Sequence, residues 1–326
     1  MLNKLQAIDK MNRMGRHRRP FLFVVSFDQN ANLVLEPPDI QNAGVLYMIG
    51  QYTNVDRNEA PDLPEKIEFK ATPVSFKIYK NAFEKVQEHL HHGNTYLTNM
   101  TFPAHVETNL TFEQIFYHAQ APYKILLPGK VVVFSPEKFV ITETDHIRSF
   151  PMKGTIDARI PDAHNKVLND PKETAEHHTI VDLIRNDLNL VARQVYVRSF
   201  RYIDHLKTNQ KELLQVSSEV VGQIGPEFYD HLGTNLFELL PAGSISGAPK
   251  KKTLDIIKDV EPHERGLFTG VFGFFDGRTV ESAVMIRYME IKNRQVLYKS
   301  GGGITVASQV ALEYQELIDK IYVPIV

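Results

Sequence analysis

Two glutamates stand on the apolar stripe of a predicted helix, where burial without a partner is costly. The N-cap pattern at Asp170 predicts a helix over about 170–191. Its apolar stripe consists of Ile180, Ile184, Leu188 and Val191. Counting back from the stripe places Glu176 and Glu173 on the same face. A cation or hydrogen-bond donors would stabilise them there. Alternatively, Glu173 completes a capping box and Glu176 has already left the core, so the pattern alone leaves metal binding open.

A second predicted helix, over about 308–322, carries two more glutamates. Glu313, Glu316 and Lys320 form a stripe beside its apolar residues. A solvated face with a Glu316–Lys320 ion pair would explain this stripe equally well. Carboxylates on two helices suit Mg²⁺, which takes one or two of them and completes its shell with water and substrate. The chain has no cysteine and no His-Cys cluster, so zinc is the less favoured ion.

Three further features could bind or react with an anionic ligand. Lys153 stands beside Gly154, Arg287 lies within an apolar strand-like run, and 301–303 is a run of three glycines. An arginine in an apolar strand needs an anion, and glycines let backbone N–H groups approach one closely. The plain alternatives are a surface lysine, a structural ion pair and a hairpin turn. The segment 241–250 does not meet the phosphate-loop pattern, which excludes that nucleotide-binding motif.

Composition narrows the class of protein. The chain has 326 residues, with 37 Lys+Arg against 39 Asp+Glu, so no positive excess supports binding to nucleic acid. The absence of cysteine excludes thiol catalysis and cysteine metal sites. No run of ~18 apolar residues predicts a membrane span, and the first residues lack the apolar core of a secretory signal. We therefore expect a cytoplasmic protein that does not bind membranes.

The elements predicted around these residues indicate an α+β fold with mostly antiparallel sheet. Helices are predicted over 79–91, 170–191 and 308–322. Strands are predicted over 21–27, 130–134, 139–142, 266–275, 281–291 and 294–298. The runs 130–134 and 139–142 are separated by four turn residues and predict a hairpin. Strands and helices do not alternate, which argues against a doubly wound parallel sheet. We expect one domain over 1–326.

A series of ordered segments resembles the chorismate-utilising enzymes. The segments are SPEKF (135–139), PMKGT (151–155), KETAEHHTIVDLIRNDL (172–188), PAGSISGAPK (241–250), ERGLFTGVFG (264–273), Ile286-Arg287, GGGI (301–304) and EYQELIDK (313–320). The resemblance covers about 75–326, with 1–74 as a short N-terminal portion of the same unit. It implies two large, mostly antiparallel sheets packed together and flanked by helices.

The same resemblance implies a site. Glu176 and Glu316 match the family's Mg²⁺ ligands, with Glu173 and Glu313 beside them. Glu137 matches its general acid–base. The residues implied to contact chorismate are Thr155, Gln215, Ser244, Phe268, Arg287, Gly301, Gly302, Gly303 and Lys320. Two of these depart from the family, since a histidine is usual at position 215 and a tyrosine is common at position 268.

Lys153 distinguishes among the family's members. Anthranilate synthases carry alanine at this position, whereas aminodeoxychorismate synthases often carry lysine. In the implied mechanism, Lys153 attacks C2 of chorismate while the C4 hydroxyl leaves, protonated by Glu137, and ammonia then displaces the lysine. Leu97 occupies the position of the lysine that activates water in isochorismate and salicylate synthases, which argues against water as the nucleophile.

The resemblance therefore implies an enzyme that makes 4-amino-4-deoxychorismate for para-aminobenzoate and folate synthesis. Because the chain has no cysteine for a glutaminase, ammonia would come from a glutamine amidotransferase partner. The alternatives are anthranilate synthase component I, an isochorismate-type synthase, or a non-catalytic subunit that binds chorismate.

Overall fold

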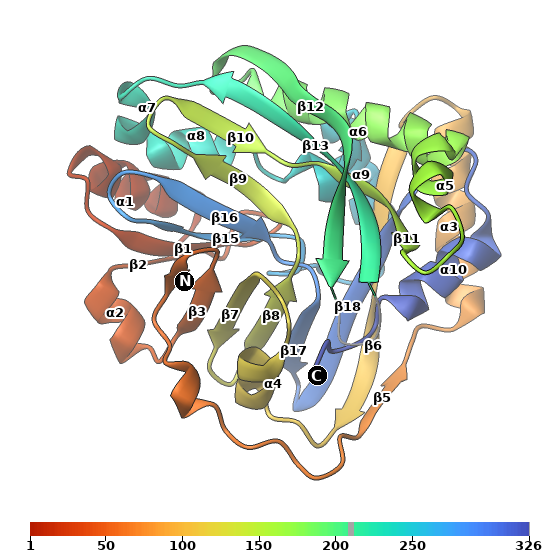
Figure 1. Ribbon diagram of the computed structural model, residues 1–326, viewed down its shortest axis with the longest axis horizontal. Coiled ribbons are helices and arrows are strands. Elements are labelled where there is room, and N and C mark those ends of the chain that lie inside the picture. The colour runs from red at the N-terminus through yellow and green to blue at the C-terminus, as the bar shows by residue number, and fades with distance from the viewer. Residues whose placement is uncertain (208–211, 326) are drawn as a thin grey trace.

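The computed structural model describes residues 1–207 and 212–325, and its strands form two nine-stranded sheets (Figure 1). The strands of the first sheet are β1 Phe21–Val25, β2 Leu33–Leu35, β9 Lys138–Thr142, β10 His146–Ser149, β11 Met152–Asp157, β12 Arg193–Lys207, β13 Glu212–Gln223, β15 Val271–Phe275 and β16 Val280–Val284. Their order is β11-β13-β10-β9-β16-β15-β1-β2, and β12 also pairs with β13.

The second sheet has the order β14-β6-β18-β17-β8-β7-β3-β4, and β5 also pairs with β6. Its strands are β3 Leu46–Ile49, β4 Tyr52–Thr53, β5 Phe69–Thr72, β6 Leu97–Thr108, β7 Tyr123–Leu127, β8 Val131–Ser135, β14 Gly247–Ala248, β17 Tyr288–Lys292 and β18 Gln295–Ile304. Neighbouring strands are antiparallel in both sheets. The predicted fold class is therefore confirmed.

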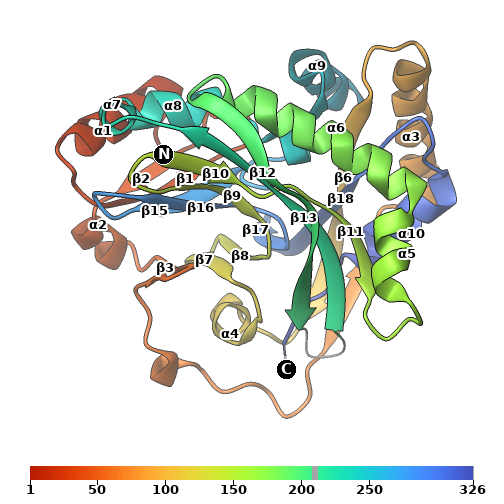
Figure 2. The same cartoon turned by 45° about the horizontal axis from the view of Figure 1, so that its top comes forward.

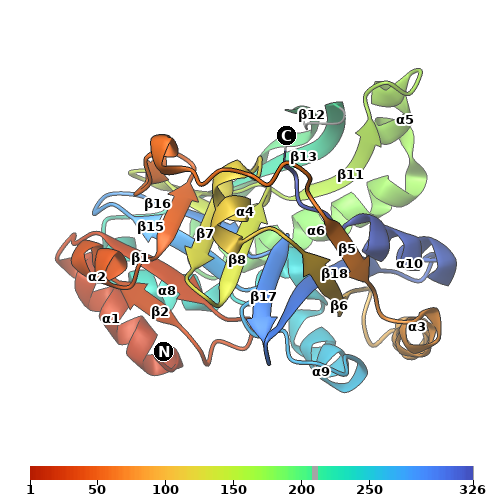
Figure 3. The ribbon, with the colours of Figure 1, turned by 90° about the horizontal axis from the view of Figure 1, so that it is seen from below.

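Helices cover the outer faces of the sheets. They are α1 Lys4–Arg16, α2 Pro37–Asn42, α3 Phe76–His91, α4 Phe112–His118, α5 Ala163–Asn169, α6 Pro171–Leu188, α7 Glu227–Asp230, α8 Leu232–Glu238, α9 Lys250–Val260 and α10 Val310–Asp319, with 3₁₀ turns η1 Arg57–Glu59 and η2 Gly243–Ile245. Figure 2 shows α6 running across β13 and β11. Figure 3 shows α3 and α10 beside β6 and β18. No helix within the described ranges is long and apolar enough to cross a membrane.

Apolar side chains fill the space between the sheets as well as the space under the helices. Strand β1 is buried along its whole length, which explains its unbroken apolar sequence. Leu22 and Val24 point into one core together with Ile125 and Val133 of the second sheet. Phe21 and other β1 side chains of the opposite face pack in the core beneath the helices. Burial on both faces makes the strands near the sheet centres rigid supports for the residues that follow them.

Two of the places where the chain crosses from one sheet to the other differ from the sequence prediction. The predicted hairpin of 130–134 with 139–142 is wrong, because β8 and β9 belong to different sheets. The predicted strand 281–291 is likewise divided into β16 and β17, which lie in opposite sheets. Glu137 stands at the first crossing and Arg287 at the second, where its φ is 51°. Each crossing thus holds a charged residue between the two sheets.

The two crossings are bonded to the strands beside them. The Val284 N–H donates to Glu137 O at 3.0 Å, and the Phe134 N–H donates to Arg287 O at 3.0 Å. Each crossing is therefore fixed by the strand that leads into the other crossing. This reciprocal pairing holds Glu137 and Arg287 in a defined relation.

The two helices that carry the candidate glutamates form where they were predicted, with shorter ends. Helix α6 begins at Pro171, and the Asp170 side chain accepts from the Glu173 N–H at 2.9 Å. The helix ends at Leu188 rather than near residue 191. Helix α10 covers 310–319 of the predicted 308–322. The three glycines of 301–303 lie within β18, paired with β6, and so do not form a hairpin turn.

Candidate active site

A cavity of about 510 Å³ lies where the two crossings meet β11, α6, β18 and α10. It collects nearly all the side chains singled out from the sequence. The predicted site residues that line it are Glu137, Lys153, Thr155, Glu173, Gln215, Ser244, Phe268, Arg287, Gly301, Gly302, Gly303, Glu313, Glu316 and Lys320. Glu176, the remaining one, is buried on α6 and contacts the cavity through Lys153. Segments distant in sequence therefore build one site.

Lys153 lies among carboxylates. Its ammonium nitrogen is 2.7 Å from Glu176 Oε2, and the Glu176 side chain is only 4% exposed. Burial by itself would lower the pKa of Lys153, but the charges of Glu176 and Glu173, and then of Glu316, outweigh burial and raise it. In this arrangement Lys153 is a cation that neutralises buried glutamates, and it must lose a proton before it can act as a nucleophile.

Glu137 has the properties of a buried acid. Burial raises the pKa of this carboxyl, while a hydrogen bond from Ser244 and the charges of Arg287 and Lys320 counteract the rise in part. The Ser244 hydroxyl donates to Glu137 Oε1 at 2.6 Å. A carboxyl that keeps its proton at higher pH than usual, with one oxygen fixed by a donor, is suited to protonate a leaving group.

Positive groups line another part of the cavity. Lys320 Nζ donates to Gly301 O at 2.9 Å and is 2.7 Å from Glu316 Oε1. Burial lowers the pKa of Lys320, and Glu316 opposes that effect. The Arg287 guanidinium lies over the ring of Tyr322, 5.2 Å from its centre. Arg287 and Lys320 together can attract a carboxylate ligand, since charge-assisted hydrogen bonds are stronger than neutral ones.

The glycines of β18 keep the wall of the cavity open. A Cβ at Gly302 would lie 3.6 Å from both Glu316 Oε1 and Lys320 Nζ. A Cβ at Gly303 would lie 3.0 Å from Leu97 and 3.9 Å from Lys153 Nζ. Larger side chains here would occupy the space between the charged groups, which explains why glycine suits these positions.

Gln215 and Phe268, the two departures from the family pattern, have structural partners. The Thr155 hydroxyl donates to Gln215 Oε1 at 2.7 Å, and Gln215 Nε2 donates to Gly154 O at 2.9 Å. Gln215 thus fixes β11 against β13, and an amide has no proton to give as an acid. The Phe268 ring packs on Tyr288, with ring centres 5.6 Å apart, and forms an apolar part of the wall.

The carboxylates of the cavity suit a small cation that prefers oxygen ligands. Within 1–207 and 212–325, no group of three or more His, Cys, Asp or Glu residues converges closely enough to hold a metal by itself. Lys153 supplies the positive charge beside Glu176, and Glu316 faces the same cavity from α10. The residues therefore fit Mg²⁺ bound by one or two carboxylates together with water and substrate, and do not fit a closed cage of four carboxylates.

Sequence reasoning missed several residues of the wall, including Asn99, Thr269 and Lys299. Thr269 has φ of 60°, which is uncommon for a β-branched residue. Its position beside Phe268 in the segment 264–273 was the only available signal.

Comparisons with known proteins show the family of this chain. The family model described as chorismate binding enzyme matches residues 10–325. The chain therefore belongs to the chorismate binding enzyme family. It is 44% identical to an uncharacterized PabA-like protein of Haemophilus influenzae over 98% of this chain and 96% of that protein. It is 31% identical to aminodeoxychorismate synthase component 1 of Escherichia coli over 74% of this chain but only 56% of that protein, so the chain matches about half the length of that relative.

Two solved structures share the fold. The menaquinone-specific isochorismate synthase of Escherichia coli superposes with a TM-score of 0.74 at 16% identity, covering 98% of this chain and 81% of that one. Anthranilate synthase component I of Streptococcus pneumoniae gives a TM-score of 0.66 at 25% identity, covering 79% of this chain and 60% of that one. Because these two enzymes are named for different reactions, the shared fold does not by itself fix the reaction of this chain.

Proposed function

We propose that this protein aminates chorismate at C4 and so forms 4-amino-4-deoxychorismate, the precursor of para-aminobenzoate in folate synthesis. The observation that carries the proposal is Lys153, an amine inside the same cavity as the buried acid Glu137. A lysine here can hold C2 of the ring, the position at which an anthranilate synthase would add ammonia. Identity does not choose between these two members, since the chain is 31% identical to an aminodeoxychorismate synthase component 1 and 33% identical to an anthranilate synthase component 1, so Lys153 carries the choice.

The proposed reaction consists of two displacements. The neutral Lys153 amine forms a bond to C2, the two ring double bonds shift from C1=C2 and C5=C6 to C1=C6 and C4=C5, and the C4–O bond breaks. Glu137 gives its proton to the departing hydroxyl, which leaves as water. Ammonia then bonds to C4, both double bonds shift back, and the C2–N bond to Lys153 breaks. The excess protons of the two nitrogens return to Lys153, Glu137 and solvent.

The other residues bind and orient the substrate. Arg287, Lys320 and the backbone of 301–303 hold one carboxylate of chorismate, and Thr155, Ser244 and Phe268 shape the pocket around the ring. Gln215 keeps β11, which carries Lys153, in place. Ammonia comes from a glutamine amidotransferase partner, since the chain has no cysteine for that chemistry and its named relative is a component 1.

Mg²⁺ is the proposed cofactor, held by Glu176 and Glu316 with Glu173 and Glu313 close by. When bound, it would supply positive charge for the ring carboxylate of chorismate. We expect Glu176→Gln and Glu316→Gln to weaken Mg²⁺ binding measured by calorimetry without turnover. Glu84→Gln, a change in an exposed pair with Lys80, is the control and should bind as the unmodified protein does. Unchanged binding in both cavity variants would contradict the metal assignment.

The function itself is tested by product identity. The purified chain is incubated with chorismate, Mg²⁺ and an ammonium salt, with and without an amidotransferase subunit, and products are identified by chromatography and mass. 4-Amino-4-deoxychorismate is expected. Anthranilate or isochorismate would overturn the proposal in favour of the corresponding synthase. Chorismate binding without any turnover in the presence of the partner would favour a non-catalytic subunit.

A further inference from the structure

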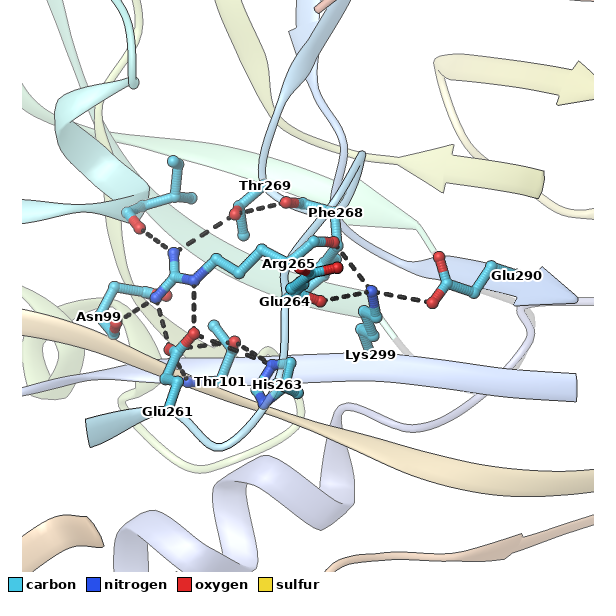
Figure 4. A network of polar contacts seen from close by, with 11 residues as sticks. Asn99, Thr101, Glu261, His263, Glu264, Arg265, Phe268, Thr269, Glu290 and Lys299 are labelled. Atoms are coloured by element: carbon cyan, nitrogen blue, oxygen red, sulfur yellow. Dashed lines mark hydrogen bonds and ion pairs between the residues drawn. The ribbon is translucent and has the colours of Figure 1, made fainter. Parts of the chain in front are cut away.

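Arg265 lies behind the wall of the cavity and lines no part of it. Its side chain is only 2% exposed, and it stacks on the ring of Phe27, with the guanidinium carbon 4.4 Å from the ring centre. An arginine has five N–H donors, and all five have acceptors here. Figure 4 shows that these acceptors come from separate segments of the chain.

Three of the five donors hold the cavity wall. Arg265 Nη1 donates to Ile245 O at 2.9 Å and to Thr269 Oγ1 at 3.3 Å, and Nη2 donates to Asn99 O at 2.6 Å. Each of these three acceptor residues lines the cavity. One buried guanidinium thereby joins β6, η2 and the segment that contains Thr269.

The contacts of Arg265 with Ile245 and Thr269 lie close to the residues that would bind and protonate the substrate. Ile245 directly follows Ser244, whose hydroxyl fixes Glu137 Oε1 at 2.6 Å. Thr269 has a left-handed backbone, with φ of 60°, and such a conformation persists only when its surroundings impose it. The hydrogen bond from Arg265 to the Thr269 hydroxyl is one of those constraints. Arg265 thus reaches the candidate acid through Ile245 and Ser244.

The remaining two donors bind Glu261, whose carboxylate neutralises the positive charge of the guanidinium. Arg265 Nε and Nη2 donate to the two carboxylate oxygens of Glu261, at 2.9 and 2.6 Å. Glu261 Oε1 also accepts from the Thr101 N–H at 2.8 Å and from the Thr101 hydroxyl at 3.1 Å. Lys299 Nζ donates to Arg265 O at 2.8 Å and so fixes the backbone of the arginine (Figure 4). A buried ion pair adds little net stability on average, but it defines geometry where its partners are fixed.

We propose that Arg265 is a positioning residue that aims Glu137 at the substrate by holding Ser244, through Ile245, and the Thr269 segment. This inference rests on the proposed function only in taking Glu137 as the proton donor. It extends the site beyond the residues that touch the cavity.

The test compares Arg265→Lys with Thr101→Val in the whole 326-residue chain. Lysine keeps the charge but has three donors on one atom, so it cannot hold Ile245, Asn99, Thr269 and Glu261 together. The valine variant removes a bond to the same Glu261 but leaves the wall contacts in place. We expect kcat for chorismate consumption to fall ~10–100-fold in Arg265→Lys with KM nearly unchanged, because small misplacement of a catalytic group is costly. Thr101→Val should keep kcat.

A second readout does not depend on turnover. The Ser244 hydrogen bond lowers the pKa of Glu137, so loosening that bond should raise this pKa further. The charged groups that act on Glu137, Arg287 and Lys320, are unchanged in the variant. The carboxyl is followed by carbon-13 NMR, with Glu137→Gln to assign its signal. Ser244→Ala should shift the pKa of Glu137 in the same direction. The double variant Ser244→Ala/Arg265→Lys should have nearly the same Glu137 pKa as Ser244→Ala alone.

Several outcomes would overturn the inference. A folded Arg265→Lys variant with the kcat and Glu137 titration of Thr101→Val would make the arginine merely structural. If Arg265→Lys does not fold, Glu261→Gln removes one acceptor of the guanidinium and should give a smaller change in the same direction; no change there contradicts the proposal. Because consumption of chorismate is followed, an unexpected product would overturn the amination alone, and the NMR titration would still decide the role of Arg265.

Discussion

Two clusters of buried charge lie on opposite sides of the same wall and differ in what their charged groups face. In the cluster behind the wall, every N–H donor of Arg265 has a fixed protein acceptor, and Glu261 is closed in by Thr101. In the cavity cluster, Lys153 and Glu137 face about 510 Å³ of open space. The comparison teaches that burial of charge does not identify a reactive site, whereas burial beside space for a ligand does.

The largest expected effect follows from replacing Lys153. Lys153→Ala should lower the rate of 4-amino-4-deoxychorismate formation at least ~10³-fold, because the covalent route is lost. Lys153→Arg keeps the positive charge beside Glu176 but supplies no nucleophile, and it should be equally inactive while remaining folded by circular dichroism. Product formation is measured by chromatography. An active Lys153→Arg variant would show that the lysine serves as a charge, as Arg265 does.

Removing the proton donor should have the next largest effect. Glu137→Gln should lower kcat/KM ~10²–10⁴-fold, the usual contribution of general acid catalysis. In the unmodified enzyme, burial raises the pKa of Glu137, so the protonated form persists above the usual range and activity should fall as pH rises through that raised value. A pH profile of kcat/KM records this falling limb. If Glu137→Gln kept both the rate and the limb, another group would be the acid.

Removing a charge from the cluster behind the wall should lower the free energy of unfolding more than removing one from the cavity cluster. Glu261→Ala leaves the Arg265 charge buried without its partner and should lower the free energy of unfolding by about 3–5 kcal/mol. Glu316→Ala, a change at a half-exposed carboxylate of the cavity, should lower it by less than ~1 kcal/mol. Urea unfolding followed by circular dichroism measures both. Equal losses would remove the distinction between the two clusters.

The smallest expected effect concerns two largely buried histidines, His177 on α6 and His263 beside Thr101. Burial lowers the pKa of His177 and of His263 from 6.5 to about 4. As pH falls from 6.5 toward 4, the unfolded chain takes up protons that the folded chain cannot, so stability is lost over that range. Each histidine should lower the free energy of unfolding by about 3 kcal/mol once the pH has fallen to the folded-state pKa.

The matched variant for this pH dependence is His263→Gln. It removes one titrating group and leaves His177, so the loss of unfolding free energy between pH 6.5 and 4 should shrink by about 3 kcal/mol. Denaturant titrations at several pH values provide the measurement. An unchanged pH dependence would mean that His263 does not stay neutral when folded.

Local sequence patterns predicted the elements of this protein better than their placement. Apolar periodicity and the Asp170 cap located α6 correctly, and its stripe placed Glu176 in the core, where it is buried. The pattern of 130–142 could not show that the strands on either side of Glu137 enter different sheets. Strand pairing depends on contacts between distant segments, which periodicity does not record.

The site was predicted where its residues belong to ordered family segments, and missed where they act through long-range hydrogen bonds. Lys153, Glu137 and Arg287 all reached the cavity. Glu261 and Arg265, four residues apart, look in the sequence like an ordinary surface pair. Their importance depends on carbonyl groups of β6 and η2, which no local pattern joins to them.

The most direct test of the account is the intact mass of the protein after mixing with chorismate and Mg²⁺ in the absence of ammonia. If Lys153 is the nucleophile, a fraction of the chain should gain the mass of chorismate less one water. Proteolysis should then place this added mass on the peptide that contains Lys153. Added ammonium should release it as 4-amino-4-deoxychorismate, and Lys153→Arg should show no adduct. Product formation by a Lys153→Arg variant, or an adduct on another residue, would contradict the central role given to Lys153.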